Sequence, residues 1–292
     1  MINKVAIVTD SNSGITQAQA KEMGIHVIPM PFYIDEIEYY EDINLTREEF
    51  YEKLTGNCNI HTSQPSPEAV IELWEEILKD YSEIIHIPMS SGLSSSYQTA
   101  RMLSEDYDGR VEVVNNQRIS VTMRQSVLDA IKLSDQGFYA KEIRRKLEDD
   151  KYNSSIYISL ETLEYLKRGG RLTPAVAMIG QLLKIKPVLQ IQGEKLDAFQ
   201  KVRTMSQAKT VMLNQIEKDI VTRFKGTKTG EGCRIHVAHS NNLEAALQFR
   251  HEIAERFTDI AEEDIYVDEL SLSVSCHIGP GALAVATTQK SI

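Results

Sequence analysis

The chain has 292 residues, of which 42% are hydrophobic and 25% charged, so it can form a globular protein of about two domains. Its formal net charge of -10 argues against nucleic-acid binding, which requires a positively charged face. The most apolar stretch, residues 175–191, is interrupted by lysines and a proline, so we expect no membrane span.

Two further absences narrow the expected location and chemistry. No signal-peptide pattern follows Met1. The three cysteines, at 58, 233 and 276, lie far apart and lack metal-ligand spacing. We therefore expect a cytoplasmic protein with reduced thiols, no metal and no cofactor.

The first elements predict an α/β fold. Residues 5–8 form a short apolar run that is typical of a buried parallel strand. A polar loop at 9–13, a helix at 16–23 and a strand at 25–30 follow. Because ligands gather beyond the carboxyl ends of strands in open α/β sheets, this loop is placed near a possible site.

The polar stretch at 61–67 leads directly into a predicted helix. Ser66 suits the N-cap and Pro67 the first helical position. Thr62 and Ser63 are therefore predicted on a loop before a helix start, where free N–H groups favour a carboxylate or phosphate. A well-capped turn with no ligand is the alternative.

A second hydroxyl-rich turn follows the predicted strand at 84–87. Residues 88–97 carry several serines, among them Ser94 and Ser95, and lead into another helix. Two such turns in successive β-α units could face one another across a crevice. This arrangement favours a binding site that Thr62 and Ser94 share.

The remaining elements divide the chain into two parts. The charged run at 148–151 predicts a boundary between an N-terminal α/β domain, residues 1–152, and a C-terminal α/β domain, residues 153–292. Further elements are predicted as strands at 111–114 and 155–158, helices at 119–133, 140–147, 163–171, 175–183 and 206–224, a hairpin around Gly193, and a β-α-β unit across 234–270.

The charge balance inverts between residues 161 and 209. Nine lysines and arginines there face four acidic residues, nine minus four or +5, inside a chain of -10. This segment indicates either a docking surface for an acidic partner or phosphate-bearing ligand, or a solvated basic face.

Several motifs together resemble the DegV family over essentially the whole chain. They are the opening at 7–11, TSQPSP at 62–67, SSGLS at 90–94, the segments at 163–171 and 183–187, and HxGPG at 277–281. The resemblance implies two α/β domains with a ligand site in the crevice between them. The ligand it implies is one long-chain fatty acid of the palmitate or oleate class.

The resemblance also implies a role without catalysis. Many members look like the fatty-acid-binding subunits of bacterial fatty acid kinase, which present the bound carboxylate to a separate kinase subunit for acyl-phosphate formation. The implied partners are thus a fatty acid and a kinase subunit, and any contact with a membrane surface is expected to be transient.

The family's functional positions can be carried over to this sequence. The carboxylate-binding positions correspond to Thr62, Ser94 and His277, with support from Ser63, Ser95 and Gly279. Arg171 and Arg203 correspond to positions on the side that faces the kinase. Ser95 departs from the family's usual glycine, so we expect strain or a different loop if that glycine requires a positive φ.

Two other functions fit parts of the sequence. A serine-dependent acyl hydrolase would use Ser94 as nucleophile, His277 as base and Asp10 as the orienting acid. A binder of a small phosphorylated metabolite would use the basic segment and the hydroxyls that precede the predicted helices.

Overall fold

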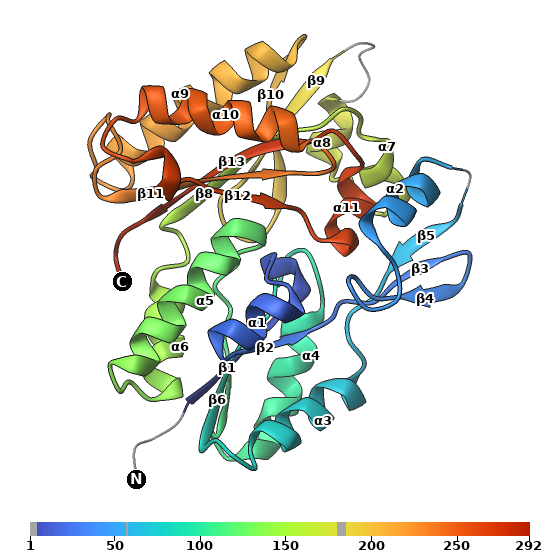
Figure 1. Ribbon diagram of the computed structural model, residues 1–292, viewed down its shortest axis with the longest axis vertical. Helices are drawn as coiled ribbons and strands as arrows, with labels where there is room; N and C mark the ends of the chain where they lie inside the picture. Colours follow the sequence, from blue (N-terminus) through green and yellow to red (C-terminus); the bar gives the residue numbers. More distant parts are fainter. Residues whose placement is uncertain (1–4, 57, 180–184) are drawn as a thin grey trace.

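The computed structural model describes residues 5–56, 58–179 and 185–292 (Figure 1). It is a mixed α/β fold built on three sheets, with strand orders β2-β1-β6-β7, β10-β9-β8-β13-β11-β12 and β4-β3-β5. In the part of the chain that is described, no helix is long and apolar enough to cross a membrane.

The first sheet is parallel and is buried between two layers of helices. Its strands are β1 (Val5–Asp10), β2 (His26–Ile28), β6 (Glu83–Ile87) and β7 (Val111–Val113). One face packs on α1 (Gln17–Met23), α5 (Ser120–Asp135) and α6 (Ala140–Asp149), and the other on α3 (Pro67–Ile77) and α4 (Ser96–Leu103). Because both faces are covered, every residue of β1 is buried.

The second sheet is mixed and comes from the later part of the chain. Its strands are β8 (Ser154–Ser159), β9 (Lys186–Ile191), β10 (Leu196–Val202), β11 (Cys233–His239), β12 (Tyr266–Glu269) and β13 (Leu283–Gln289). The helices α9 (Met205–Thr222) and α10 (Leu243–Arg256) cover one face (Figure 1). The opposite face packs against residues of the first part of the chain, including Met30, Met89 and Met123.

A small antiparallel sheet joins the two parts. It contains β3 (Phe32–Ile34), β4 (Ile37–Tyr39) and β5 (Ile60–Thr62), and α2 (Arg47–Thr55) packs on it. The helix α11 (Leu272–Ile278), far away in sequence, shares this core through Leu272 and Cys276. The short helices α7 (Glu164–Arg168) and α8 (Pro174–Ile179) and the 3-10 turns η1 (Ser11–Ser13), η2 (Ser104–Tyr107) and η3 (Glu262–Asp264) complete the fold.

Most predicted elements are present with shifted ends. The hairpin around Gly193 is formed by β9 and β10, and the predicted β-α-β unit is β11-α10-β12 with its two strands paired in parallel. One helix is shorter than predicted: α7 spans Glu164–Arg168. The described part of the helix predicted at 175–183 is α8 (Pro174–Ile179). The rest of the predicted helix at 175–183 lies outside the described residues. The boundary at 152/153 stays a prediction.

Candidate functional site

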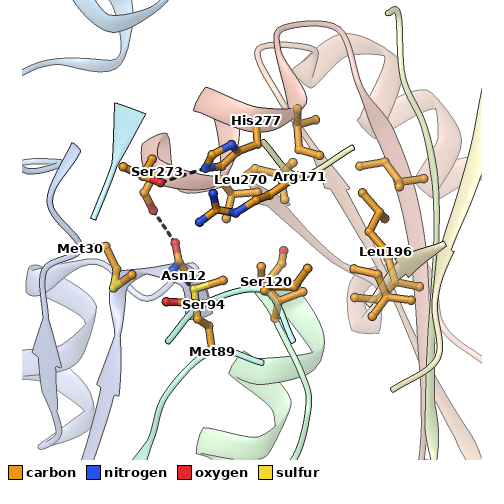
Figure 2. A pocket seen from close by; sticks show the side chains of 18 of the residues that line it. Asn12, Met30, Met89, Ser94, Ser120, Arg171, Leu196, Leu270, Ser273 and His277 are labelled. Carbon is orange, nitrogen blue, oxygen red and sulfur yellow. Dashed lines mark hydrogen bonds between the residues drawn. The ribbon is translucent and has the colours of Figure 1, made fainter. Parts of the chain in front are cut away.

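A cavity of about 290 Å³ lies between the loops of the parallel sheet and the inner face of the six-stranded sheet (Figure 2). We call it the main cavity. It is close to the lower end of the size range of small-molecule sites. Its lining includes residues of the loop after β1, the end of β5, the loop before α4, the start of α5, the strands β8, β9, β10, β11 and β13, and α11.

The polar end of the main cavity is built around Thr62 and His277. Oγ1 of Thr62 lies 2.9 Å from Nε2 of His277, across 215 positions of sequence. Thr62 ends β5, where its backbone pairs with Phe32 of β3, and His277 lies in the last turn of α11. The small antiparallel sheet therefore fixes the hydroxyl, and α11 fixes the imidazole.

The surroundings of His277 keep its imidazole neutral at neutral pH. Burial, and secondarily the positive charge of Arg171, lower the pKa of His277 to about 4. Its Nδ1 is buried and has no hydrogen-bond partner among the described residues. A methyl group at Gly169 would lie 2.0 Å from this Nδ1, so the backbone of Gly169 packs directly against the ring.

Four residues of the first part of the chain place α11. The Asn12 Oδ1 accepts hydrogen bonds from the hydroxyls of Ser271, at 2.7 Å, and Ser273, at 2.5 Å. Figure 2 shows the bond from Ser273. A carboxylate oxygen of Glu41 accepts the N–H of Leu272 at 3.0 Å. Tyr51 and Thr62 contact later turns of the same helix, through Ser275 and His277. Contacts along the length of α11 thus hold His277 in register with Thr62.

The serine-rich loop before α4 forms the neighbouring wall. Ser94 Oγ lies 2.8 Å from Ser96 Oγ and accepts the Ser96 N–H at 3.2 Å. Thr99 donates a hydrogen bond to Gln64 Oε1 at 3.1 Å, which ties α4 to the segment that follows Thr62. Both predicted hydroxyl-rich segments therefore line one cavity.

Ser95 carries no backbone strain, because its φ of -78° and ψ of 0° lie in the right-handed region that any residue adopts. The other branch of that expectation, a loop that differs from the family's, stays a prediction. The expectation for Thr62 was wrong in detail. Thr62 is not at a helix start, because it ends an extended strand. The N-cap of α3 is Ser66, whose hydroxyl accepts the Ala69 N–H, and neither residue lines the main cavity.

The opposite end of the main cavity is apolar. Figure 2 shows Leu196 at the far side from Asn12 and Met30. Strand residues supply most of this surface, namely Ile156, Ile158, Ile191, Leu196, Ala284 and Ala286. The apolar segments 156–158 and 282–286 thus both contribute lining residues, whereas residues 175–178 of α8 contribute none.

Ser120 is a lining residue that the sequence did not indicate. It begins α5 with a φ of 53°, a left-handed conformation that costs a non-glycine residue about 1–3 kcal/mol. Its hydroxyl is buried and has no partner in the described parts of the chain. Figure 2 places it between the polar end and Leu196.

The polar loop at 9–13 was expected near a site, and its residue Asn12 lines the cavity.

The remaining predicted residues take different positions. Arg171 is exposed, lines the main cavity and donates a hydrogen bond to the Gly169 carbonyl at 2.9 Å. Arg203 is exposed just before α9 and does not line the cavity. Ser63 lines the cavity beside Thr62. Gly279 ends α11 with a φ of 75°, and a methyl group there would lie 2.2 Å from the Tyr165 ring.

The hydrolase hypothesis requires a Ser94–His277–Asp10 chain that the structure does not form. The Asp10 carboxylate accepts the backbone N–H groups of Asn12, at 2.9 Å, and Met89, at 2.8 Å. Burial raises the pKa of Asp10 to about 6. The partner of His277 is Thr62 and that of Ser94 is Ser96, so no orienting acid reaches the imidazole in the described chain.

Residues 5–56, 58–179 and 185–292 contain no group of three histidine, cysteine or acidic side chains that could hold a metal ion.

Comparison with known proteins gives full-length matches. A family model described as an uncharacterised protein of the DegV family matches residues 4–290. A DegV domain-containing protein of Staphylococcus aureus strain N315 is 31% identical over 289 residues, which cover 99% of this chain and 100% of the relative.

Solved structures also match over nearly the full length. One, described as showing fatty acid binding of a DegV family protein from Thermus thermophilus, has a TM-score of 0.87 at 27% identity and covers 98% of this chain and 99% of that one. Another, DegV of Bacillus subtilis, described as a fatty acid binding protein, has a TM-score of 0.85 at 29% identity and covers 99% and 100%.

Proposed function

The chain belongs to the DegV family, and we propose that it binds one long-chain fatty acid in the main cavity. The carboxylate would lie at the Thr62–His277 end and the acyl chain along the inner face of the six-stranded sheet. One observation carries this proposal: a single cavity has hydroxyls and an imidazole at one end and aliphatic strand residues at the other. Its solved relatives from Thermus thermophilus and Bacillus subtilis are described as fatty acid binding.

The hydrogen bonding of His277 sets the direction of donation at the polar end. Its pKa of about 4 leaves one ring N–H at neutral pH. If Nε2 carries this hydrogen, it donates to Thr62 Oγ1, and the threonine O–H is then free to donate to a carboxylate. A hydrogen on Nδ1 would be buried against Gly169 without a partner. We infer the first arrangement, in which Thr62 and Ser94 donate to the ligand.

The energetics suit tight but reversible binding. A palmitate tail has about fourteen methylene groups at about 0.8 kcal/mol each, a gross gain of about 11 kcal/mol on leaving water. Each hydrogen bond to the carboxylate adds about 1.5–3 kcal/mol. Association and ordering of the chain cost several kcal/mol in the opposite direction. The tail therefore supplies affinity, and the hydroxyl end supplies orientation.

The finer proposal is presentation of the carboxylate to a kinase subunit, with no catalysis by this chain. Arg171 is exposed and lines the polar end, so a docked partner and the ligand could both reach it. Arg203 is exposed outside the cavity, where only a partner could contact it. Hydroxyl donors leave the carboxylate oxygens more nucleophilic than a buried ion pair would. This role would place the protein in the cytoplasm, with two domains that divide near residue 152 and hold the ligand between them.

The proposal is tested by calorimetric titration of oleate into protein stripped of lipid, with oleyl alcohol as the matched ligand that lacks the carboxylate. We expect saturable binding at one site per chain, and weaker binding of the alcohol. Absence of saturable oleate binding would refute the proposal. Equal affinity for acid and alcohol would refute the placement of the carboxylate.

A further inference from the structure

A second cavity, of about 440 Å³, lies between α5 and the β11–β12 edge of the six-stranded sheet. Figure 1 shows α5 rising from the lower part of the molecule toward these strands. The lining includes Arg124 and Gln125 of α5, Arg234 and His236 of β11, and Tyr266 of β12. Val121, in the first turn of α5, borders both cavities, so that turn lies between them.

His236 is a buried polar residue that lines the second cavity. Side chains alternate along β11: Ile235 and Val237 pack under α9 and α10, whereas His236 and Ala238 are on the face that meets the first part of the chain. His236 is 8% exposed, and neither of its ring nitrogens has a hydrogen-bond partner among the described residues. A polar group buried in this way normally has a partner, which is the reason to look for a ligand.

The hydrogen-bonding capacity of His236 is that of a neutral imidazole. Burial, and then the charges of Arg234 and Arg124, lower the pKa of His236 to about 4. One ring nitrogen therefore offers an N–H donor and the other an acceptor at neutral pH. Arg124 and Arg234 line the same cavity as the ring.

The two arginines keep donors available. Arg124 stacks over the Tyr266 ring, with Cζ 4.5 Å from the centroid, and donates one hydrogen bond to Gln19 at 3.1 Å. Arg234 makes long contacts, at 3.5 Å to the carbonyls of Gln289 and Ile292 and at 3.9 Å to Asp129. A guanidinium has five N–H donors in a planar fork that matches carboxylate and phosphate oxygens. Both residues are thus held in place with part of the fork unused.

The charges of the second cavity are unevenly distributed. Its cations are Arg124, Arg234 and the exposed Lys290, and its carboxylates are Asp259 and Asp264 from the segment after α10. Asp259 already accepts a hydrogen bond from Thr227 at 3.1 Å. Arg124 and Arg234 both lower the pKa of His236, so their positive charges act on the ring. On the same side, Arg234 also lies 3.9 Å from Asp129 of α5.

We propose that the second cavity binds a small molecule through a carboxylate or phosphate group, held by Arg124, Arg234 and His236. An anionic oxygen there accepts the otherwise unused imidazole N–H and charge-assisted hydrogen bonds from the two guanidinium groups. Asp259 and Asp264 disfavour a ligand with negative charge at both ends. The site is separate from the main cavity and does not depend on fatty-acid binding.

Calorimetric titration with inorganic phosphate and, separately, with acetate tests this proposal and identifies the preferred head group. We expect saturable binding of at least one anion. Arg124→Gln and His236→Phe should each weaken it about tenfold or more, the size expected for a lost charge-assisted hydrogen bond. Arg145→Gln removes the same charge from the exposed part of α6 and serves as the matched control.

The variants distinguish a specific anion-binding site from a general attraction of anions to positive charge. Arg124 is half-buried on the helix surface, so Arg124→Gln remains a valid test if the buried His236→Phe variant unfolds in a thermal melt. Two results would overturn the proposal: no saturable binding of either anion to the wild type, or an equal loss of affinity in Arg124→Gln and Arg145→Gln.

Discussion

Replacing Thr62 by valine removes one hydroxyl from the polar end of the main cavity and leaves the shape of the side chain nearly unchanged. Thr62 ends β5 and pairs with Phe32 through the backbone, and valine is equally suited to a strand. The substitution deletes the expected donor to the carboxylate and the contact with Nε2 of His277 at 2.9 Å. A hydrogen bond to a charged group is worth about 1.5–3 kcal/mol, so oleate affinity should fall about 10- to 150-fold.

The assay for Thr62→Val is calorimetric titration with oleate and with oleyl alcohol. The loss should be confined to the acid, because the alcohol makes no carboxylate contact. Thr222→Val is the matched control, since its exposed hydroxyl donates only to the Lys218 carbonyl on α9. Unchanged oleate affinity in Thr62→Val, or an equal loss for acid and alcohol, would refute the assignment of Thr62.

Three further outcomes are expected. Gly279→Ala should lower the melting temperature more than Gly137→Ala does. Both glycines have a positive φ, but of the two only Gly279 lies so close to a neighbour that an added methyl group would meet it, the Tyr165 ring at 2.2 Å. Equal decreases in melting temperature would contradict this packing. Burial raises the pKa of Asp268 from 3.8 to about 7, so ionisation of this carboxyl opposes folding. The stability of Asp268→Asn relative to wild type should therefore rise between about pH 4 and about pH 7 and stay level above that. Denaturant titrations at several pH values measure this difference, and a difference that does not change with pH would contradict the reasoning. Arg203→Glu should weaken association with the kinase subunit in a salt-dependent way and leave oleate affinity unchanged, as measured by surface plasmon resonance and calorimetry; unaltered association would remove the docking role.

Local patterns were sufficient to predict the parallel sheet and the hairpin. The apolar run at 5–8 is buried on both faces as β1, and the turn at Gly193 joins β9 to β10. These elements depend on neighbouring residues, namely short apolar runs and a glycine where the chain reverses. The capped start of α3 at Ser66 and Pro67 was predictable for the same reason.

The small antiparallel sheet was not predicted, and this changed the interpretation of Thr62. Its strands β3, β4 and β5 have three residues each, too few for a periodic pattern. The pairing of β5 with β3 joins residues 26 to 30 positions apart and is decided by the shared core with α11. As a result, a hydroxyl expected at a helix start lies at the end of a strand.

The contacts that complete the site could not be predicted from local sequence. The pairing of Thr62 with His277 and the hydrogen bonds of Asn12 to the start of α11 join residues more than 200 positions apart. The left-handed backbone conformation of Ser120 could not be predicted from its residue type, because serine rarely adopts that conformation. The hydroxyl-rich turns indicated Thr62 and Ser94, and the family resemblance added His277. The loop that contains Asn12 was expected near a site, whereas Ser120 emerged only from the fold.

Mass spectrometry of the freshly purified protein tests the central claim most directly. Under native conditions the protein should carry one adduct per chain, and denaturation should release it as a fatty acid with a chain of palmitate or oleate length. A native mass equal to that of the bare chain, with no adduct after incubation with palmitate or oleate, would contradict fatty-acid binding in the main cavity.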